Sequence, residues 1–412
     1  MMSNKVKKSG LEFEVPSGWS LKNLDSLAVI QQGISKGKKY KNVKTVFHPY
    51  LRVANVKDGY FDLSEIKEIE IPATDLERYA VLENDILITE GGDPDKLGRG
   101  CIWTGQVCKP VFQNHVFRIR TDVSLLSPRF LFNYLQSHKA KTYFLNSAKQ
   151  TTGIASINSS QVKETPILLP PISEQNSIAK ILGTTDKVIQ LTEKLITQKE
   201  LQKKWLMNQL LSGKKRLKGF KEEWKEDQLG EFFLERRETG FTDLPLLSIG
   251  QNGVYLQAES AKKDTSNRDK RKYKRICSGD IGYNTMRMWQ GRSAFSSHEG
   301  IVSPAYTIVK SKNNAHSLYF AYLFQTSRTI NQFWRNSQGL VDDTLNCKFK
   351  DFSIVRIILP KKEEQKAIAS ILSASDLELN LLRERLGKLH KQKKGIMQLL
   401  LTGKVRVKEN EN

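Results

Sequence analysis

The feature that most constrains this chain is an internal repeat. Residues 167–218 align with residues 357–408 without a gap, and 21 of these 52 positions are identical. A weaker likeness near the start of each copy places Trp19 against Trp224. A period of 190 residues is far too long for a solenoid of short repeats. The sequence is therefore a duplication, in which each copy has a variable part followed by a conserved segment.

The two conserved segments predict long amphipathic helices. Their apolar residues recur at spacings of three, four and seven, and each helix is expected to run about 38 residues, or roughly 57 Å. Pro170 and Pro360 precede the helices, and Ser173 is the predicted N-cap of the first. Gly213 and Gly403 stand where a helix C-cap is expected. The start and stop signals therefore agree in both copies.

A helix of this length cannot bury its apolar stripe within one small domain, whereas two matching stripes can bury each other. We therefore predict an antiparallel helix pair, an internal pseudo-two-fold relation and one globular domain near each end. The alternative is that each helix packs only on its own domain. The predicted fold class is α+β, with two mixed α/β domains joined by two long coiled-coil-like helices. The expected segments are domain 1 at 1–166, helix 1 at 167–218, domain 2 at 219–356 and helix 2 at 357–412.

Both variable parts have the composition of mixed α/β domains, with β-branched and aromatic runs separated by Gly-rich loops. Their features follow a similar order: strands, a Gly-rich loop, a strand, helical sequence and a closing strand before the conserved helix. In the first part, strands are expected at 50–56, 59–63, 85–89, 115–120 and 165–170, and helices at 128–137 and 139–148. In the second, strands are expected at 244–250, 253–257, 279–284, 305–310 and 353–360, and one helix at 317–334.

The charge of the chain indicates a polyanionic partner. Lys and Arg total 66 against 44 Asp and Glu, a formal net charge of +22, which is typical of nucleic-acid-binding proteins. Residues 262–275 hold eight basic and two acidic side chains, and residues 36–44 hold five basic and no acidic ones. The alternative is a generic basic surface. A membrane surface is disfavoured, because the sequence has no separate amphipathic anchor and no lipidation motif.

The sequence also indicates a cytoplasmic location. The N-terminal residues lack the apolar run of a signal peptide, and no stretch of about 18 apolar residues occurs. The four cysteines form no CxxC pair and no zinc-ligand spacing, which is typical of free thiols in a reduced compartment.

The chain lacks the motifs of several enzyme classes. It has no GxxxxGK[ST] phosphate loop, no GxSxG nucleophile elbow and no HExxH zinc motif, and it lacks the motifs of base methyltransferases. Glu90, Asp93 and Asp95 are close in sequence, yet they stand beside Lys96 and Arg99 in a stretch that favours a turn over a metal site. The sequence predicts a protein with neither catalytic nor metal-ligating residues.

The sequence resembles the DNA-specificity subunits of type I restriction–modification systems. The conserved helices open with "LPPISEQNSIAKIL" and "LPKKEEQKAIASIL" and close with "QLLSGKKRLKG" and "LLLTGKVRVK". Further likeness lies in "GWSLKNL", "YLRVANVKDGYFDL", "EGGDPDKLGRG" and "TTGIASINSSQVKETPILLPP" of the first variable part. In the second it lies in "GDIGYNTMRMWQGRSAFSSHEGIVSPAYTI". The resemblance covers almost the whole chain, and these motifs are specific only when taken together.

The resemblance implies a non-catalytic subunit in which each variable part is a target-recognition domain for one half of a bipartite, asymmetric DNA site. It implies that the long helices set the spacer between the half-sites; a helix of roughly 57 Å corresponds to about 17 base pairs. It also implies docking of two methyltransferase subunits, which carry S-adenosylmethionine, and through them of restriction subunits that use ATP and Mg²⁺. No cofactor is expected on this chain itself.

Within this interpretation, polar loop residues are the candidates for contact with DNA, since Arg pairs with guanine and Asn with adenine. The candidates in the first domain are Lys36, Lys38, Lys39, Asp93, Lys96, Arg99, Asn114 and Ser156. In the second they are Gln251, Asn252, Lys263, Arg268, Lys272, Arg275, Asn284, Arg287, Trp289 and Arg292. The candidates for partner docking on the spacer helices are Glu174, Gln175, Ile178, Leu182, Glu364, Gln365, Ile368 and Leu372.

Two other functions are compatible with the composition. One is a stand-alone nucleic-acid-modifying enzyme with divergent motifs, and the other is a general DNA-binding scaffold that uses a coiled coil for assembly. The sequence also leaves open whether Glu174 and Glu364 recur only to begin a helix, where the dipole favours an anion, or also to bind a partner.

Overall fold

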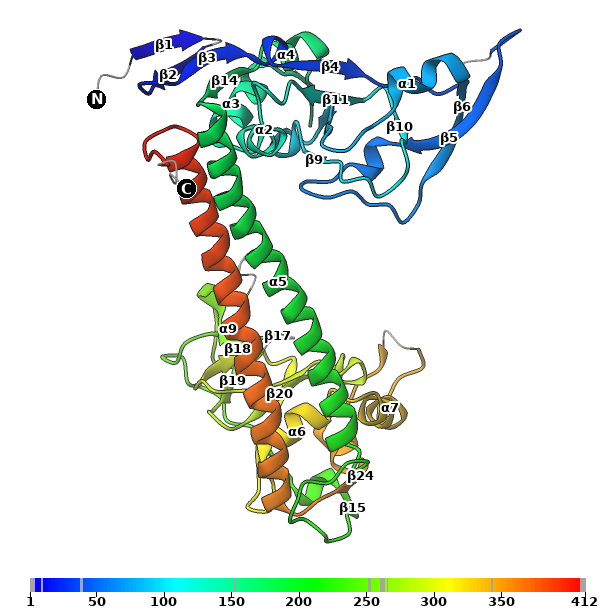
Figure 1. Cartoon of the computed structure of the whole chain (residues 1–412). Helices are drawn as coiled ribbons and strands as arrows, with labels where there is room; N and C mark the ends of the chain where they lie inside the picture. The colour runs from blue at the N-terminus through cyan, green and yellow to red at the C-terminus, as the bar shows by residue number, and fades with distance from the viewer. Residues whose placement is uncertain are drawn as a thin grey trace. The chain divides into compact units, whose positions relative to one another are not determined.

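The computed structural model describes residues 4–8, 10–37, 40–151, 153–250, 253–259, 264, 266–341 and 344–407 (Figure 1). The chain forms two compact units, which do not follow the sequence in simple order. The first unit takes residues 1–192 and 385–412, and the second takes residues 193–384. Each unit therefore contains one variable part together with one portion of each long helix, in place of the four sequential segments expected above.

The first unit is built on mainly antiparallel strands, with one parallel pair formed by β5 and β10, and on helices packed against them. Its helices are α1 (Leu76–Tyr79), α2 (Pro128–Leu135), α3 (His138–Ser147) and α4 (Ser159–Lys163). Its strands are β1 (Asn4–Lys8), β2 (Leu11–Val15), β3 (Ser20–Asn23), β4 (Ala28–Gln32), β5 (Thr45–Leu51), β6 (Lys67–Pro72), β7 (Ile86–Thr89), β8 (Gly91–Gly92), β9 (Gly100–Ile102), β10 (Val111–Phe112), β11 (Val116–Thr121), β12 (Lys149–Thr151), β13 (Ile154–Ser156) and β14 (Pro166–Leu169).

The second unit repeats the plan with fewer strands. Its helices are α6 (Ser317–Leu323), α7 (Ser327–Asn336) and α8 (Phe349–Ser353). Its strands are β15 (Lys225–Gln228), β16 (Phe233–Arg236), β17 (Leu247–Gly250), β18 (Gly253–Leu256), β19 (Lys274–Ile276), β20 (Ile281–Asn284), β21 (Ser293–Phe295), β22 (Gly300–Val302), β23 (Tyr306–Ser311) and β24 (Arg356–Leu359).

The same four-stranded antiparallel sheet lies at the centre of each unit. Its strand order is β4-β11-β7-β9 in the first unit and β16-β23-β20-β21 in the second. The registers also correspond, because Ile86 faces Ile119 and Ile281 faces Val309. The strand that leads into each long helix pairs with an early strand, β14 with β3 and β24 with β15. The expected order of strands, loop, helix and closing strand is therefore present in both units.

The long helices are α5 (Ile172–Leu210) and α9 (Lys362–Leu400), each of 39 residues. Ser173 is not the N-cap of α5. The amide of Gln175 donates to the carbonyl of Pro171 at 3.0 Å, so the helix already begins before Ser173. The helix C-terminal turns agree with the sequence, since Gly213 and Gly403 adopt φ of +71° and +67°, the left-handed region that favours glycine.

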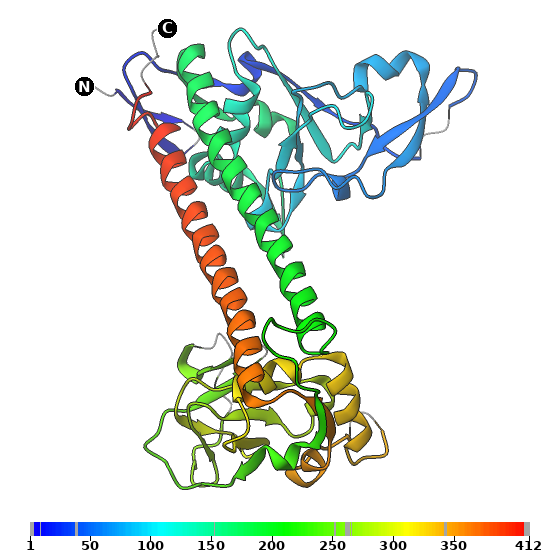
Figure 2. The same ribbon diagram turned by 60° about the horizontal axis from the view of Figure 1, so that its bottom comes forward.

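The two helices pair antiparallel within each unit (Figure 2). In the first unit Lys393 of α9 lies 2.5 Å from Asp186 near the start of α5. In the second unit Lys203 near the end of α5 lies 2.5 Å from Asp376 of α9. Residues of both long helices also belong to the hydrophobic core of each unit, and Ile178 is one of those in the first unit. The predicted helix pair is thus confirmed, although the helices also pack on the domains.

Three sequence-based assignments of secondary structure differ from the structure. Residues 50–56 are a strand only as far as Leu51, and residues 59–63 form only an isolated bridge at Phe61. The single helix expected at 317–334 is two helices, α6 and α7. The break falls at Thr326, whose hydroxyl accepts from the amide of Thr329 and caps the start of α7. A capping threonine competes with helix continuation because its side chain satisfies a free amide of the first turn.

Among the helices of the described residues, none combines the length and the apolarity needed to cross a membrane.

Candidate nucleic-acid interface

Loops from distant parts of the first domain meet at one end of its central sheet. The amide of Asn114 donates to the carbonyl of Ile34 at 3.1 Å, and the amide of Glu90 donates to the carbonyl of His115 at 3.0 Å. The amide of Ile157 donates to the carbonyl of Glu90 at 2.8 Å. These backbone bonds hold together the loops that follow β4, β7, β10 and β13. We call this set of loops the loop end of the first domain.

Most of the candidate residues of the first domain lie at this loop end. Lys36 is exposed, Asn114 and Arg99 are half-buried, and Ser156 pairs with Gly91 through β13 and β8. Asp93 is bound by Lys96 at 2.5 Å. Lys38 and Lys39 lie outside the described residues.

Two carboxylates of the loop end are engaged by neighbouring side chains. The hydrogen bond and charge of Lys96, together with Arg99, hold the pKa of Asp93 below its usual range. Glu90 lies 2.6 Å from Nδ1 of His115. Among the residues that the structure describes, no three His, Cys, Asp or Glu side chains are grouped to hold a metal ion.

The second domain has the corresponding loop end. The amide of Thr285 donates to the carbonyl of Ala305 at 3.2 Å, and the amide of Cys347 donates to the carbonyl of Thr285 at 2.8 Å. These bonds match those that Glu90 makes in the first domain, so Thr285 and Glu90 stand at equivalent positions. The two domains therefore present different side chains on the same loop framework.

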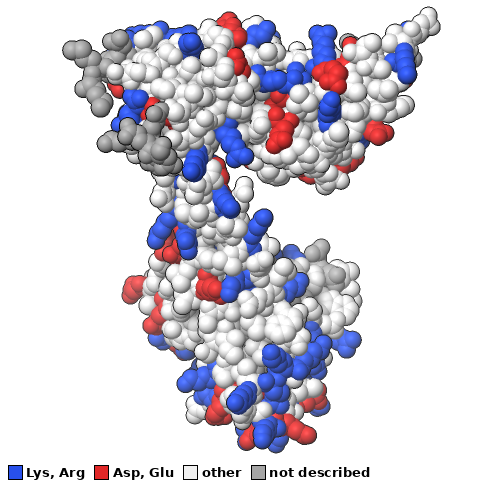
Figure 3. All heavy atoms as spheres, viewed as in Figure 1, with Lys and Arg blue, Asp and Glu red and all other residues white. Residues whose placement is uncertain are grey.

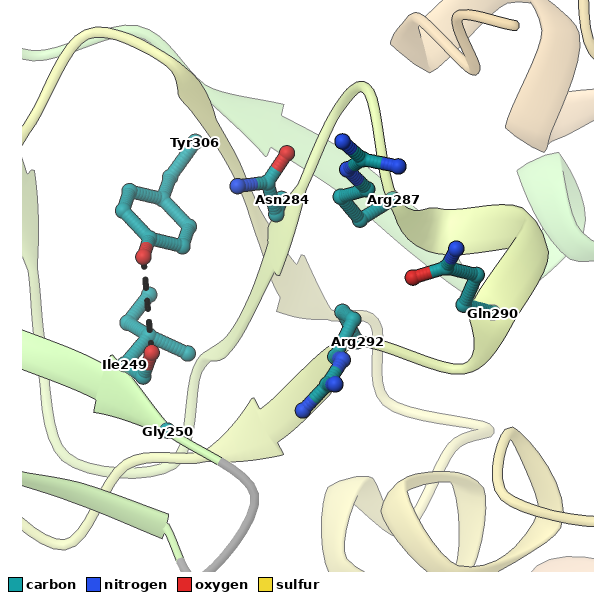
Figure 4. Close-up of a pocket in the computed structure, with 7 residues that line it drawn as sticks. All are labelled: Ile249, Gly250, Asn284, Arg287, Gln290, Arg292 and Tyr306. Carbon is teal, nitrogen blue, oxygen red and sulfur yellow. Dashed lines mark hydrogen bonds between the residues drawn. The ribbon is translucent and has the colours of Figure 1, made fainter. Parts of the chain in front are cut away.

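A pocket of about 370 Å³ opens at the loop end of the second domain (Figure 4). Its walls carry hydrogen-bond donors from two arginines and two amides, and no carboxylate is among its lining side chains. The amide of Met286 donates to Oδ1 of Asn284 at 3.0 Å, which orients this side chain in the pocket wall. The pocket is lined by Ile249, Gly250, Asn284, Arg287, Gln290, Arg292 and Tyr306.

The candidate residues of the second domain are distributed in three ways. Asn284, Arg287 and Arg292 line the pocket. Trp289 lies in the same loop, but its indole nitrogen donates to the carbonyl of Met286 at 3.0 Å. Arg268 and Lys272 lie exposed on the segment before β19, and Arg275 lies within β19. Gln251, Asn252 and Lys263 lie outside the described residues.

Arg275 is held by its own domain. Its guanidinium binds Glu238 at 2.8 Å and Glu299 at 2.5 Å, and it lies over the ring of Phe241. Hydrogen bonds to these two carboxylates raise its pKa. These contacts give Arg275 a structural role at the start of β19.

Charge alone does not locate the interface. Figure 3 shows Lys and Arg side chains interspersed with Asp and Glu on the face in view. Gln290 and Tyr306, which line the pocket, were not among the sequence candidates. Tyr306 could have been found because it pairs with Asn284 across β23 and β20, and Gln290 because it lies in the same loop as Arg287 and Arg292.

The residues expected to dock a partner are buried inside their own units, each at most 4% exposed. A buried side chain offers no surface to another protein, so this expectation is corrected for all eight. The two glutamines instead hold the starts of the long helices against their domains. Gln175 accepts from the amide of Ser127, and Gln365 accepts from the amide of His316. The residues corrected in this way are Glu174, Gln175, Ile178, Leu182, Glu364, Gln365, Ile368 and Leu372.

Each buried glutamate is bound by an arginine that comes from the other repeat. Arg406 binds Glu174 through Nε and Nη2, both at 2.8 Å, and Trp19 donates to the same carboxylate at 3.0 Å. In the second unit Arg216 binds Glu364 through Nε and Nη2, also at 2.8 Å. Trp224 repeats the indole bond at 3.2 Å. We call these two groups the clasps of the units. They explain why the glutamates recur. Each glutamate carboxylate binds the arginine at the end of the other repeat, and this contact joins the two repeats within one unit.

Comparison with known proteins assigns the architecture to a family. The family described as Type I restriction modification DNA specificity domain matches the chain twice, over residues 16–201 and 221–391. The chain belongs to this family. Its two matches cover most of the sequence and correspond to the two copies of the repeat. As a specificity subunit, it is a non-catalytic DNA-recognition component of a restriction–modification system.

Two relatives match this specificity subunit over nearly their full length. The putative type I restriction enzyme MjaX specificity subunit of Methanocaldococcus jannaschii is 28% identical over 428 residues, which cover 96% of this chain and 95% of the relative. The MjaVIII specificity subunit of the same organism is 27% identical over 424 residues, covering 96% of this chain and 94% of the relative.

Solved structures share the fold. The HsdS subunit of Thermoanaerobacter tengcongensis aligns with a TM-score of 0.52 at 15% identity, covering 95% of this chain and 99% of that one. The type I restriction–modification S subunit of M. genitalium aligns with a TM-score of 0.56 at 15% identity, covering 93% and 96%. At this identity the likeness supports the fold alone.

Proposed function

We propose that this specificity subunit reads a bipartite, asymmetric DNA site, with one half-site for each domain. The observation that carries the proposal is the pair of loop ends: one framework, repeated in both units, that presents different side chains. Two domains with the same framework and different loops can approach DNA in the same way and distinguish different bases. The net charge of +22 favours association with a polyanion such as DNA.

The paired helices are proposed to set the distance between the half-sites. Each helix has 39 residues, which corresponds to about 58 Å at 1.5 Å per residue. Cross-repeat ion pairs support a rigid element, because Lys203 binds Asp376 and Lys393 binds Asp186. A rigid connection of fixed length is what a constant spacer requires.

The same helices are proposed to dock two copies of a methyltransferase subunit. Exposed apolar side chains recur at equivalent positions of the two repeats. Ile181 and Ile371 are 38% and 36% exposed, and Leu191 and Leu381 are 55% and 56% exposed. A surface that occurs twice in one chain fits two copies of one partner. S-adenosylmethionine, and the ATP and Mg²⁺ of the restriction subunits, would be bound by those partners.

Replacement of one domain tests whether each domain reads its own half-site. Residues 20–160 would be exchanged for the equivalent segment of another family member, which leaves Trp19 and the first clasp intact. The complex with methyltransferase subunits is expected to methylate a site in which one half is new and the other unchanged, as measured by mapping methylated positions in genomic DNA. The matched exchange is residues 225–350, which should change the other half-site. A change of both half-sites from either exchange would contradict the proposal.

The alternative functions give different results. A stand-alone enzyme would methylate or cleave DNA as the purified chain without partners, and a general scaffold would support methylation without a fixed sequence. Sequence-specific methylation that requires both this chain and its partner subunits is the expected outcome.

A further inference from the structure

The same loop closes the same strand pair in both domains. Residues 90–99 join β7 to β9, and residues 285–292 join β20 to β21. The amide of Thr89 donates to the carbonyl of Arg99 at 2.9 Å, and the amide of Asn284 donates to the carbonyl of Arg292 at 3.0 Å. Arg99 and Arg292 therefore occupy equivalent backbone positions at the end of their loops. The first loop is two residues longer, so the equivalence rests on these backbone bonds.

Both arginines follow a glycine that the turn requires. Gly98 has φ of +65° and Gly291 has φ of +74°. A Cβ atom would lie 2.9 Å from Cδ2 of Phe144 at Gly98 and 2.8 Å from Cδ1 of Ile330 at Gly291. Phe144 belongs to α3 and Ile330 to α7, which follow the central sheet in their respective domains. The Gly-Arg turn is thus built and packed in the same way twice.

The rest of each loop differs in chemistry. The first loop carries Asp93 bound to Lys96, whereas the second carries Arg287 and Gln290 in the wall of the pocket. Each domain thus has an arginine at the same backbone position of this loop, and the side chains around that arginine differ between the two domains.

Arg292 is placed to receive an anionic group. Its side chain is exposed and lines the same pocket as Arg287 (Figure 4). Within the described part of the chain, its guanidinium makes neither an ion pair nor a hydrogen bond. In the first domain, within the described residues, the guanidinium of Arg99 likewise makes neither an ion pair nor a hydrogen bond, and Lys96 already binds Asp93 of the same loop. Both turns can therefore offer a guanidinium to a ligand.

We propose that Arg99 and Arg292 each bind a backbone phosphate of DNA, at corresponding places beside the two half-sites, while the differing residues around them read bases. This inference rests on the proposed function of the two domains. A contact that is common to two domains with different targets cannot by itself distinguish those targets. Phosphates are the same at every step of the duplex, and Arg binds them through two parallel hydrogen bonds. The common arginine sets the register, and the pocket residue Asn284 has the donor and acceptor groups that suit a base edge.

The salt dependence of DNA binding tests the proposal. The full chain in complex with its methyltransferase subunits would be titrated with specific and non-specific duplexes at several NaCl concentrations. Arg292→Gln and Arg99→Gln are each expected to weaken binding to every duplex by roughly tenfold, since a charged hydrogen bond is lost. Each should also make the plot of log K against log salt less steep by about 0.9, and the double variant by about twice that. Arg292→Lys keeps the charge and should keep most of the slope.

The methylated sequence provides the second measurement. Both half-sites should stay unchanged in Arg292→Gln, whereas Asn284→Ala should relax one position of one half-site. The matched control is Lys310→Ala, because Lys310 is an exposed cation towards the far end of β23, away from the pocket residue Tyr306. Its removal should leave the slope and the methylated sequence unchanged.

Three outcomes are decisive. A methylated motif relaxed at one base pair by Arg292→Gln would mean that this arginine reads a base, and an unchanged affinity and slope would mean that it does not contact DNA. Either result would refute the proposed phosphate contact. The proposed function would be unaffected as long as the wild-type complex methylates a bipartite site. A wild-type complex that methylates no bipartite site would refute the proposed function instead, and the slope on non-specific DNA would still decide the role of the arginines.

Discussion

The clasp of the first unit shows how a few side chains join the two ends of the sequence. Glu174 is 4% exposed, and its carboxylate accepts from Arg406 and Trp19. Burial raises the pKa of this carboxyl group, but the hydrogen bonds from Arg406 and Trp19 outweigh it, and the pKa lies below its ordinary value of 4.5. A carboxylate with a lowered pKa stabilises the fold above its ordinary pKa, and the contribution is lost as the pH falls through the lowered value.

Glu174→Gln is expected to reduce the stability of the first unit by about 2 kcal/mol at neutral pH, because Arg406 loses its ionised partner but keeps access to solvent. The difference from the wild type should shrink as the pH falls below about 4.5, where the wild-type carboxylate also becomes protonated. Hydrogen exchange of amides in each unit at several pH values would measure both effects.

The second clasp supplies the control for this prediction. Glu364→Gln should increase exchange in the second unit and leave the first unit unchanged, because Glu364 is bound by Arg216 and Trp224. Equal loss of protection in both units from either variant would contradict the idea that each clasp closes its own unit.

At the scale of elements, the long helices explain which repeated residues are identical. Lys203 and Lys393 are one identical pair and Asp186 and Asp376 another, and the structure joins them crosswise. Each residue of one repeat thus has its partner in the other repeat, and the same Lys–Asp ion pair forms twice. A substitution at either residue would break one of these two ion pairs. The exposed positions that are also apolar in both repeats have no such partner within the pair, and this is the basis of the proposed docking surface.

Leu191→Asp and Leu381→Asp are expected to weaken binding of a methyltransferase subunit by tenfold or more each, because a charge in an apolar interface must be desolvated. DNA binding by the chain itself should change little. Titration of the partner subunit by calorimetry or mass photometry would give the number of copies bound and their affinities.

Leu201→Lys is the matched control for the docking variants. Leu201 is 64% exposed, and the equivalent position of the second repeat is Lys391. If two copies of one partner use equivalent surfaces, this substitution should have little effect on their binding. A loss as large as that of Leu191→Asp would place the docking surface elsewhere on α5.

At the scale of the whole molecule, both long helices contribute residues to each unit. The helix pair proposed to set the spacer can therefore be lengthened only by equal insertions in both helices. The boundaries between the units fall at 192–193 in α5 and at 384–385 in α9. A heptad inserted at both places leaves the contacts inside each unit in register. The spacer between the half-sites is expected to grow by about three base pairs, since seven residues add roughly 10 Å.

Mapping of methylated sites would measure the spacer in this variant, and both half-sites should be retained. A heptad inserted only near Lys199 is the control, because it shifts α5 against α9 on one side of the boundary, where Lys199 binds Glu378. That single insertion should destabilise the chain. An unchanged spacer in a folded, active double insertion would refute the role of the helices as a ruler.

The repeat in the sequence was sufficient to predict the duplication, the antiparallel helices and the domain class. Those properties follow from periodicity and identity along the chain, which can be recognised without knowing the three-dimensional contacts. The resemblance carried by the helix-opening motifs also led to the family. Ser173 and the helix expected at 317–334 show the limit of this approach, since helix ends depend on competing caps whose outcome is set by packing.

The partners of the repeated residues came from the folded chain alone. Arg406 meets Glu174 across more than two hundred residues, and no spacing rule connects them. The equivalence of Arg99 and Arg292 was established by matching backbone hydrogen bonds, because their loops differ in length. The buried docking candidates were misassigned for the same reason. Repetition indicates that a residue matters, but the three-dimensional neighbours decide whether it faces the core, a partner or DNA, because burial and pairing are properties of contacts distant in sequence.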